Sequence, residues 1–461
     1  MGVLYLIGLT AGFAATGLAM LTWFSGATLS GMARAERFAI GFLAGMLIQT
    51  LVALMMAFVG FALAGWWWAV MGLISLVVVV LRYGSLPRIV AADPISVHTG
   101  KALWGLIAFG GVALAVWALW GTFTLPTMEY DGLVIWSYRD KVLLAERVIH
   151  TPSLRDPLRL VAQPLHPYLL PVLETSFLIA WGSFSYVITR MPHAMVYFCY
   201  LMAAWSVSRS QHSVVRGLMM AAALVLLPAM ATAPVDLSTR EPFMAVMAMV
   251  STWMLVRWAQ DSRPEFLLMS LFFAFAMQQT KIEGLPFAVG TILGALVIAV
   301  GSGPERGRRL VELAYCSTLF ALAVPWLLVK RGIPPAHVDP FQVNYSNVLG
   351  VTPENLMTAC RVMGAEFLFR PELYGLLPVL VLWGLVTGWR RGERLARIGV
   401  LLGPLVLLAA ILAIYAVRQG ELPSDRNASI TRRMICVLPA LTVAALALPR
   451  RRKVDTEAVS P

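Results

Sequence analysis

Charged residues are scarce in this chain of 461 residues. Asp, Glu, Lys and Arg make up 13% of it, whereas they make up about 25% of a typical soluble protein. Hydrophobic residues make up 59%, and the mean hydropathy is +0.76. A water-soluble fold cannot bury that much apolar surface, and a disordered or collagen-like chain has the opposite composition. The composition therefore excludes a soluble enzyme and predicts a polytopic membrane protein.

Several signatures of other protein classes are also missing. The four cysteines form no CxxC pair, so neither a disulfide framework nor a zinc site is indicated. No glycine-rich phosphate loop points to a nucleotide. Ionisable residues are nearly absent from the middle of the apolar runs, where ion-coupled transporters usually place them, and the two halves of the chain show no repeated span spacing. These absences argue against a transporter.

Apolar runs of about the length that crosses a bilayer, near 20 residues, occur thirteen times. They predict an all-α protein with about thirteen transmembrane helices, or as few as eleven because several runs are short. A further short stretch, 168–182, is predicted to be a helix at the outer membrane surface or a partly re-entrant one. The thirteen runs are 3–24, 38–63, 65–82, 102–124, 192–208, 214–231, 242–258, 265–280, 285–300, 313–330, 373–389, 398–417 and 434–449.

The net charge of +12 is explained by topology. If the loop 125–191 faces outward, the inner loops hold more than half of the 36 Lys and Arg residues, as the positive-inside rule requires. The N-terminus then lies outside and the basic tail 450–461 in the cytoplasm. We expect a multi-pass protein of a bacterial inner (cytoplasmic) membrane, with membrane lipid as a partner and no nucleic acid.

Polar residues gather at the outer ends of the predicted spans. Taken one by one, these clusters are also explained as solvated loops, helix caps or surface hairpins. Taken together, however, they are suited to catalysis on a phosphate-bearing substrate. Acids can abstract protons or bind a divalent metal, and Lys and Arg can bind phosphate. We therefore predict an enzyme that uses a lipid-phosphate substrate at the outer face. The candidate residues are Glu129, Asp131, Arg139, Lys141, His166, Asp236, Lys281, Glu283, Arg432 and Arg433.

The order of these clusters resembles that of the polytopic GT-C glycosyltransferases, the class containing protein O-mannosyltransferases and the aminoarabinose transferase. An acidic loop follows an outward-going span and leads into Trp136-Ser137-Tyr138-Arg139-Asp140-Lys141. A His166-Pro167 motif, a second acid at Asp236, a Thr280-Lys281-Ile282-Glu283-Gly284 turn and the Arg432-Arg433 pair follow in sequence. The resemblance covers roughly 115–449. It departs from the family pattern in having three spans before the acidic loop, and in the residues that follow Asp236.

The resemblance implies transfer of a sugar from a polyprenyl-phosphate donor to an acceptor hydroxyl of a glycan, lipid or protein, with inversion at the sugar carbon. Asp131 is the expected base. Asp236, Glu129 or Glu283 would orient the acceptor, and Asp131 with Asp236 are the candidate ligands of a divalent metal, Mg²⁺ or Mn²⁺. Lys281 with Arg432 or Arg433 would bind the lipid phosphate. His166 would contact phosphate or sugar, and Arg139 and Lys141 complete the binding residues.

The expected organisation has three parts. Residues 1–101 form extra N-terminal spans, 102–449 a GT-C-like catalytic core with outer loops 125–191 and 331–372, and 450–461 the cytoplasmic tail. Two other functions stay open. A polymerase or ligase of lipid-linked polysaccharide would need the arginines but no Asp at a span end, and a lipid-glycan transporter or flippase would place polar groups deep in the bundle.

Overall fold

The structure is a computed structural model in which every described element is helical. It describes residues 1–24, 28–29, 32–82, 100–124, 137–149, 151–155, 166–211, 213–231, 240–331, 351–369, 374, 377–389, 394–417 and 423–447. The helices of the first half are α1 (Gly2–Leu21), α3 (Arg34–Phe58), α4 (Gly65–Arg82), α5 (Lys101–Thr124), α6 (Ser137–Glu146), α7 (Pro152–Arg155), α8 (Leu169–Trp181), α9 (Tyr186–Arg209), α10 (Val214–Val225) and α11 (Pro228–Ala231).

The second half continues the bundle. Its elements are α12 (Glu241–Asp261), α13 (Pro264–Thr280), α14 (Gly284–Val300), η4 (Gly303–Glu305), α15 (Arg306–Ser317), η5 (Thr318–Ala323), α16 (Val324–Arg331), α18 (Pro353–Phe369), α20 (Leu377–Trp389), α21 (Arg394–Val417) and α22 (Pro423–Leu446). The all-α fold predicted from the sequence is thus confirmed for the described part of the chain.

Each predicted apolar run overlaps one or more helices in the described part of the chain. Among the described residues, seven helices are long and apolar enough to cross a membrane, and five shorter ones are also apolar. The number of thirteen spans therefore stays a prediction. The run 214–231 is divided into α10 and α11 just before Pro228, as expected because proline cannot donate a hydrogen bond within a helix.

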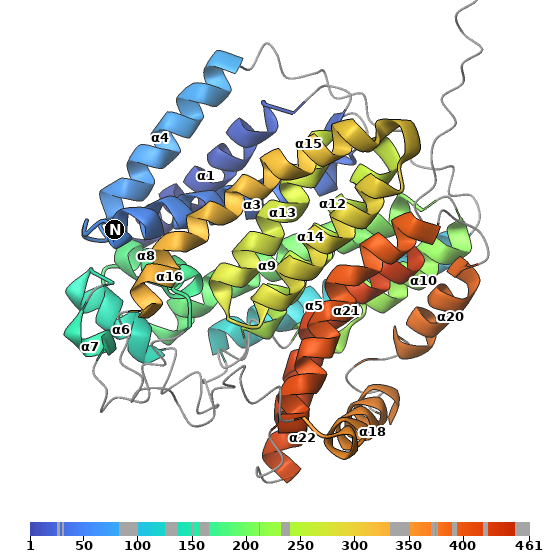
Figure 1. Ribbon diagram of the computed structural model, residues 1–461. Helices are drawn as coiled ribbons and strands as arrows, with labels where there is room; N and C mark the ends of the chain where they lie inside the picture. Colours follow the sequence, from blue (N-terminus) through green and yellow to red (C-terminus); the bar gives the residue numbers. More distant parts are fainter. Residues whose placement is uncertain are drawn as a thin grey trace, which may run out of the picture.

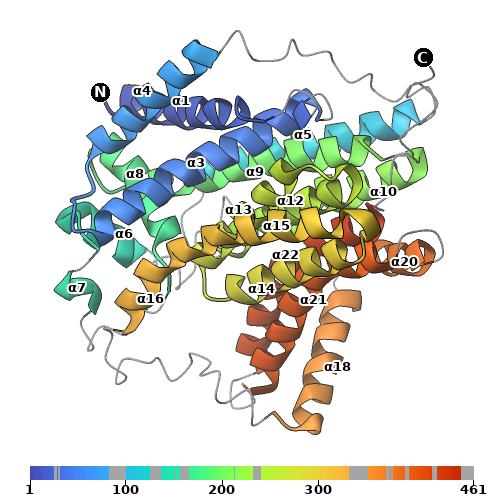
Figure 2. The ribbon, with the colours of Figure 1, turned by 45° about the horizontal axis from the view of Figure 1, so that its top comes forward.

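Helix α12 forms the centre of the bundle, with α4 along one edge and α20 along the other (Figures 1 and 2). It packs on α13, α9 and α22 and is buried on all sides, as expected for a helix that is apolar all round. By contrast, α4 and α5 expose large apolar side chains such as Leu73, Val80, Phe109 and Val112. This arrangement of apolar surface suits contact with lipid and not with water.

Glycines allow two pairs of helices to approach closely. A Cβ on Gly17 of α1 would collide with the carbonyl of Gly41 in α3, and one on Gly45 would collide with the carbonyl of Phe13. Gly41 and Gly45 are four residues apart, the spacing of small residues that is typical of packed membrane helices. In the same way, Gly294 of α14 lies against Gly399 of α21. These contacts hold α1 against α3 and α14 against α21.

The short helix α8 lies inside the bundle. Its residues from Leu169 to Leu178 are all buried, and it packs on α1, α3, α6, α9 and α13. The sequence predicted this helix at the surface or partly re-entrant. Its burial matters because it carries Glu174, a carboxylate that must find partners in this apolar setting.

Candidate functional site

The three acids proposed for catalysis, Glu129, Asp131 and Asp236, lie outside the described residues. The same holds for the side chain of Arg432, whose backbone belongs to α22. The remaining predicted site residues are described, and most of them meet at one end of the bundle.

Lys281 occupies the turn between α13 and α14, where it is surrounded by carboxylates. Its Nζ lies 2.6 Å from Oε1 of Glu241, the first residue of α12, and 3.6 Å from Oε1 of Glu283. The same Glu283 oxygen lies 3.6 Å from Nε of Arg433 in α22. None of the four side chains is more than 13% exposed. The turn is therefore a buried ion-pair network and not the solvated hairpin that its sequence also allowed.

The neighbours of Lys281 and Glu283 determine the charge of both groups. Burial lowers the pKa of Lys281, but Glu241 and Glu283 outweigh this effect and raise the pKa above its usual value. Burial raises the pKa of Glu283, but Lys281 and Arg433 outweigh it and lower the pKa to about 2. Both groups are therefore charged at neutral pH.

A second network surrounds Glu174 of α8. His193 of α9 lies with Nε2 2.8 Å from Oε1 of Glu174, and Arg240 places Nη2 3.3 Å from Oε2. All three side chains are at most 3% exposed. Sequence reasoning did not select these residues. A usable signal was present, however, because an ionisable residue within an apolar run is by default a functional candidate, and Glu174 is one.

Arg139 and Lys141 are separated by the geometry of α6. Arg139 is fully buried and donates from Nη2 to the carbonyl of His166 at 2.9 Å, with its guanidinium 4.3 Å from the Tyr168 ring. Lys141 is exposed, and its Nζ lies 3.4 Å from Oη of Tyr186. Residues two apart on a helix point to different sides, so one cation lies inside and the other outside. Arg139 fixes the segment that carries His166.

Asp140, the next residue of α6 after Arg139, is also buried and interacts with Glu174. Burial raises the pKa of Asp140 well above its usual value, and the neighbouring Glu174 raises it further, while Arg240 and Arg139 act in the opposite direction. Burial and Glu174 therefore both favour the protonated form of Asp140. One proton shared between two buried carboxyl groups avoids two adjacent negative charges.

His166 connects the two networks. It is 8% exposed and lies within electrostatic reach of Glu283, Lys281, Arg139 and Arg240. Burial lowers the pKa of His166 to about 3, with Lys281, Arg139 and Arg240 acting in the same direction and Glu283 against them. The imidazole is therefore neutral at physiological pH.

Together these side chains form one polar centre. Four cationic side chains, Arg139, Arg240, Lys281 and Arg433, and four carboxyl groups, Asp140, Glu174, Glu241 and Glu283, meet in it. The centre lies at one end of the bundle, because α12 begins in it at Glu241 and ends at Asp261, about 30 Å away at 1.5 Å per residue. Its members are Arg139, Asp140, His166, Glu174, His193, Arg240, Glu241, Lys281, Glu283 and Arg433.

A metal-binding group is not found in the part of the chain that the structure describes: no three or more His, Cys, Asp and Glu side chains are placed to hold an ion. Asp131 and Asp236, the predicted metal ligands, lie outside that part. The divalent metal stays a prediction.

The seven long apolar helices and the lipid-suited surface define the chain as a multi-pass membrane protein. Comparisons with protein-family models, with curated proteins and with solved structures give no match.

Proposed function

We propose that this chain is an inverting glycosyltransferase that moves a sugar from a polyprenyl-phosphate donor to an acceptor hydroxyl on the outer face of the membrane. The observation that carries the proposal is the polar centre. His166, Arg139, Lys281, Glu283 and Arg433 were selected from distant parts of the sequence, and they come together at one end of the bundle. A chance set of loop residues would not be expected to converge in this way.

The cations of the centre suit a phosphate leaving group. Arg433 is 12% exposed, and its Nε and Nη1 have no hydrogen-bond partner among the described residues. Donors of this kind, held in a site of low dielectric, stabilise charge far better than donors in water. In the proposed role, Arg433 and Lys281 bind the phosphate and stabilise the charge that develops on it.

A neighbouring amide suits the sugar. Gln279 is fully buried, and neither atom of its amide has a hydrogen-bond partner among the described residues. Buried polar groups normally find partners, and a hydroxylated ligand would supply both a donor and an acceptor. In the proposed role, Gln279, in the last turn of α13, contacts the sugar.

The proposed reaction has a simple balance of bonds. The acceptor oxygen forms a bond to the anomeric carbon while the bond from that carbon to the phosphate oxygen breaks. Asp131 takes the hydroxyl proton, and the electron pair leaves with the polyprenyl phosphate. Because phosphate is a competent leaving group once its charge is stabilised, no strong general acid is required.

Topology and localisation belong to the same proposal. The proposed topology has thirteen spans, a GT-C-like core and the polar centre facing outward. The basic residues at the opposite end of the helices support this orientation. A bacterial inner membrane is the expected location.

The proposal is tested by incubating the purified protein in nanodiscs with a panel of labelled polyprenyl-phosphate hexoses and pentoses and with membrane acceptors. We expect labelled product from one donor, and loss of activity by about 10²-fold or more in Asp131→Asn if Asp131 is the base. Asp261→Asn, at the other end of α12, is the matched control and should retain activity.

The variant Arg433→Gln separates the alternatives. If Asp131→Asn and Asp236→Asn stay active while Arg433→Gln is inactive, a polymerase or ligase acting on lipid-linked glycan replaces the proposed mechanism. Uptake or flipping of the lipid without any bond breaking would contradict both enzymatic proposals.

A further inference from the structure

A second candidate site lies at the end of the bundle opposite the polar centre. Here a cleft of about 320 Å³ opens between α12, the turn 301–303, α15 and α21, within the usual range of about 300–1,000 Å³ for ligand sites. Ala259 and Ile298 contribute apolar side chains to its lining, and Arg309 and Arg394 contribute positive charge. None of its nine lining residues is acidic.

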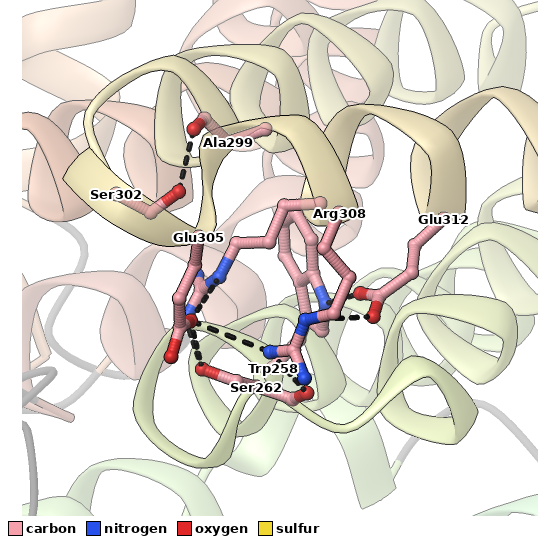
Figure 3. A network of polar contacts seen from close by, with 8 residues as sticks. Trp258, Ser262, Ala299, Ser302, Glu305, Arg308 and Glu312 are labelled. Carbon is pink, nitrogen blue, oxygen red and sulfur yellow. Dashed lines mark hydrogen bonds and ion pairs between the residues drawn. The ribbon is translucent and has the colours of Figure 1, made fainter.

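Arg309 is held in a fixed position beside the cleft. Its side chain is 2% exposed, and Nε donates to Oε2 of Glu305 at 3.1 Å. Its Nη2 donates to the Ser262 hydroxyl, and its guanidinium lies 5.0 Å from the Trp258 ring. Figure 3 shows Ser262, Glu305 and Trp258 grouped in this network. The cation is therefore ordered before any ligand arrives, which lowers the entropic cost of binding.

The acids near the cleft pair with Arg308 and Arg309 and leave Arg394 as its surplus charge. Glu305 is 43% exposed, and its Oε2 is shared by Arg309 and Arg308, while Glu312 interacts with Arg308 and with the indole N–H of Trp258. Glu305 and Glu312 thus pair with Arg308 and Arg309. No described residue makes an ion pair with Arg394. The cleft keeps a surplus of positive charge.

A further cation lies one turn along α21. Arg397 is 5% exposed, and its Nε and Nη2 have no hydrogen-bond partner among the described residues. The charged group within its electrostatic reach is another cation, Arg216. Arg397 does not line the cleft, but a buried arginine for which the described part of the chain offers no carboxylate partner adds to the positive potential there.

We propose that this cleft binds the phosphate of an anionic phospholipid. The phosphate would lie between Arg309 and Arg394, and its acyl chains would follow the apolar surface of α15 and α21, where Val311, Tyr315 and Leu395 are exposed. Basic pockets between membrane helices are the usual sites for such headgroups. The proposal concerns the opposite end of the bundle and does not depend on glycosyl transfer.

Native mass spectrometry of the full-length protein tests this proposal. The delipidated protein is titrated with phosphatidylglycerol, with phosphatidylcholine, or with inorganic phosphate alone. We expect one phosphatidylglycerol to bind more tightly than phosphatidylcholine, and its affinity to fall about fivefold in Arg394→Gln. The matched control is Arg306→Gln, an exposed arginine at the same end that does not line the cleft, and it should leave the affinity unchanged.

Two outcomes would overturn the proposal. Equal losses in Arg394→Gln and Arg306→Gln would show diffuse attraction by a basic surface and not a site. Binding of inorganic phosphate with the same dependence on Arg394, without selectivity among the lipids, would assign the cleft to a free phosphate-bearing anion. Arg394→Lys keeps the charge and should stay within about twofold of the native affinity, which separates loss of charge from loss of fold.

Discussion

Lys281 Nζ lies 2.6 Å from Oε1 of Glu241, although forty residues separate the two in the chain. This contact joins the turn after α13 to the start of α12, and through Glu283 it extends to Arg433 of α22. The polar ends of these helices thus meet around one buried cation.

Removal of the Lys281 cation should destabilise the protein strongly. In Lys281→Met the carboxylates of Glu241 and Glu283 stay buried with one cation fewer, and breaking a buried pair in this way costs about 3–5 kcal/mol of unfolding free energy. Thermal unfolding in detergent should show a large fall in apparent Tm. The control is Lys101→Met, at the exposed start of α5. Equal behaviour of the two variants would contradict a structural role of the network.

The protein should lose stability on the acid side of neutrality. His166 has an ordinary pKa of 6.5 that is lowered to about 3 in the fold, and Glu283 one of 4.5 lowered to about 2. The unfolded state therefore binds more protons than the folded state between these values, so stability falls as pH drops, first from 6.5 and further from 4.5. Apparent Tm measured against pH should show both phases.

The variant His166→Asn provides the control for this pH dependence. It removes the imidazole, so the fall in apparent Tm should begin near pH 4.5 and not near 6.5. A pH profile that is identical to that of the native protein would show that His166 does not cause the upper phase.

Asp140 should have a pH dependence of the opposite sign. Because burial and Glu174 raise its pKa well above the ordinary 3.8, the folded state holds a proton that the unfolded state releases. Its contribution to stability is complete below pH 3.8 and is lost as pH rises through the folded pKa. Asp140→Asn cannot ionise, so its apparent Tm relative to the native protein should increase with pH. Glu174→Gln, which removes the partner of Arg240 and His193, should destabilise at every pH.

Close packing of α1 on α3 should make Gly17 sensitive to a single methyl group. A Cβ at Gly17 would collide with the backbone of Gly41, whereas one at Gly8 of the same helix meets nothing within 4 Å. Gly17→Ala should therefore lower stability by about 1–3 kcal/mol, and Gly8→Ala should not lower it. Unfolding of both variants in detergent checks this, and a neutral Gly17→Ala would contradict the helix contact.

The sequence by itself determined the helical class and the approximate positions of the apolar helices. An apolar run of about 20 residues that crosses a bilayer forms a helix, because every backbone polar group must find its hydrogen-bond partner within the segment. Thus α12 begins beside Pro242, and α13 begins at Pro264 after Ser262 adopts a left-handed conformation, signals that can be read locally. The separation of Arg139 from Lys141 also followed from helical spacing alone.

Only the tertiary structure decided which polar residues meet. Sequence spacing could not show that Glu241 pairs with Lys281, or that Glu174 contacts both His193 and Arg240. Ion pairs between helices depend on how the helices pack. Burial then keeps His166 neutral, whereas Lys281 and Arg433 keep Glu283 ionised. The cleft beside Arg309 likewise exists because the end of α12 meets the first turns of α15 and α21. Side chains from separate helices share a site only where packing brings them together.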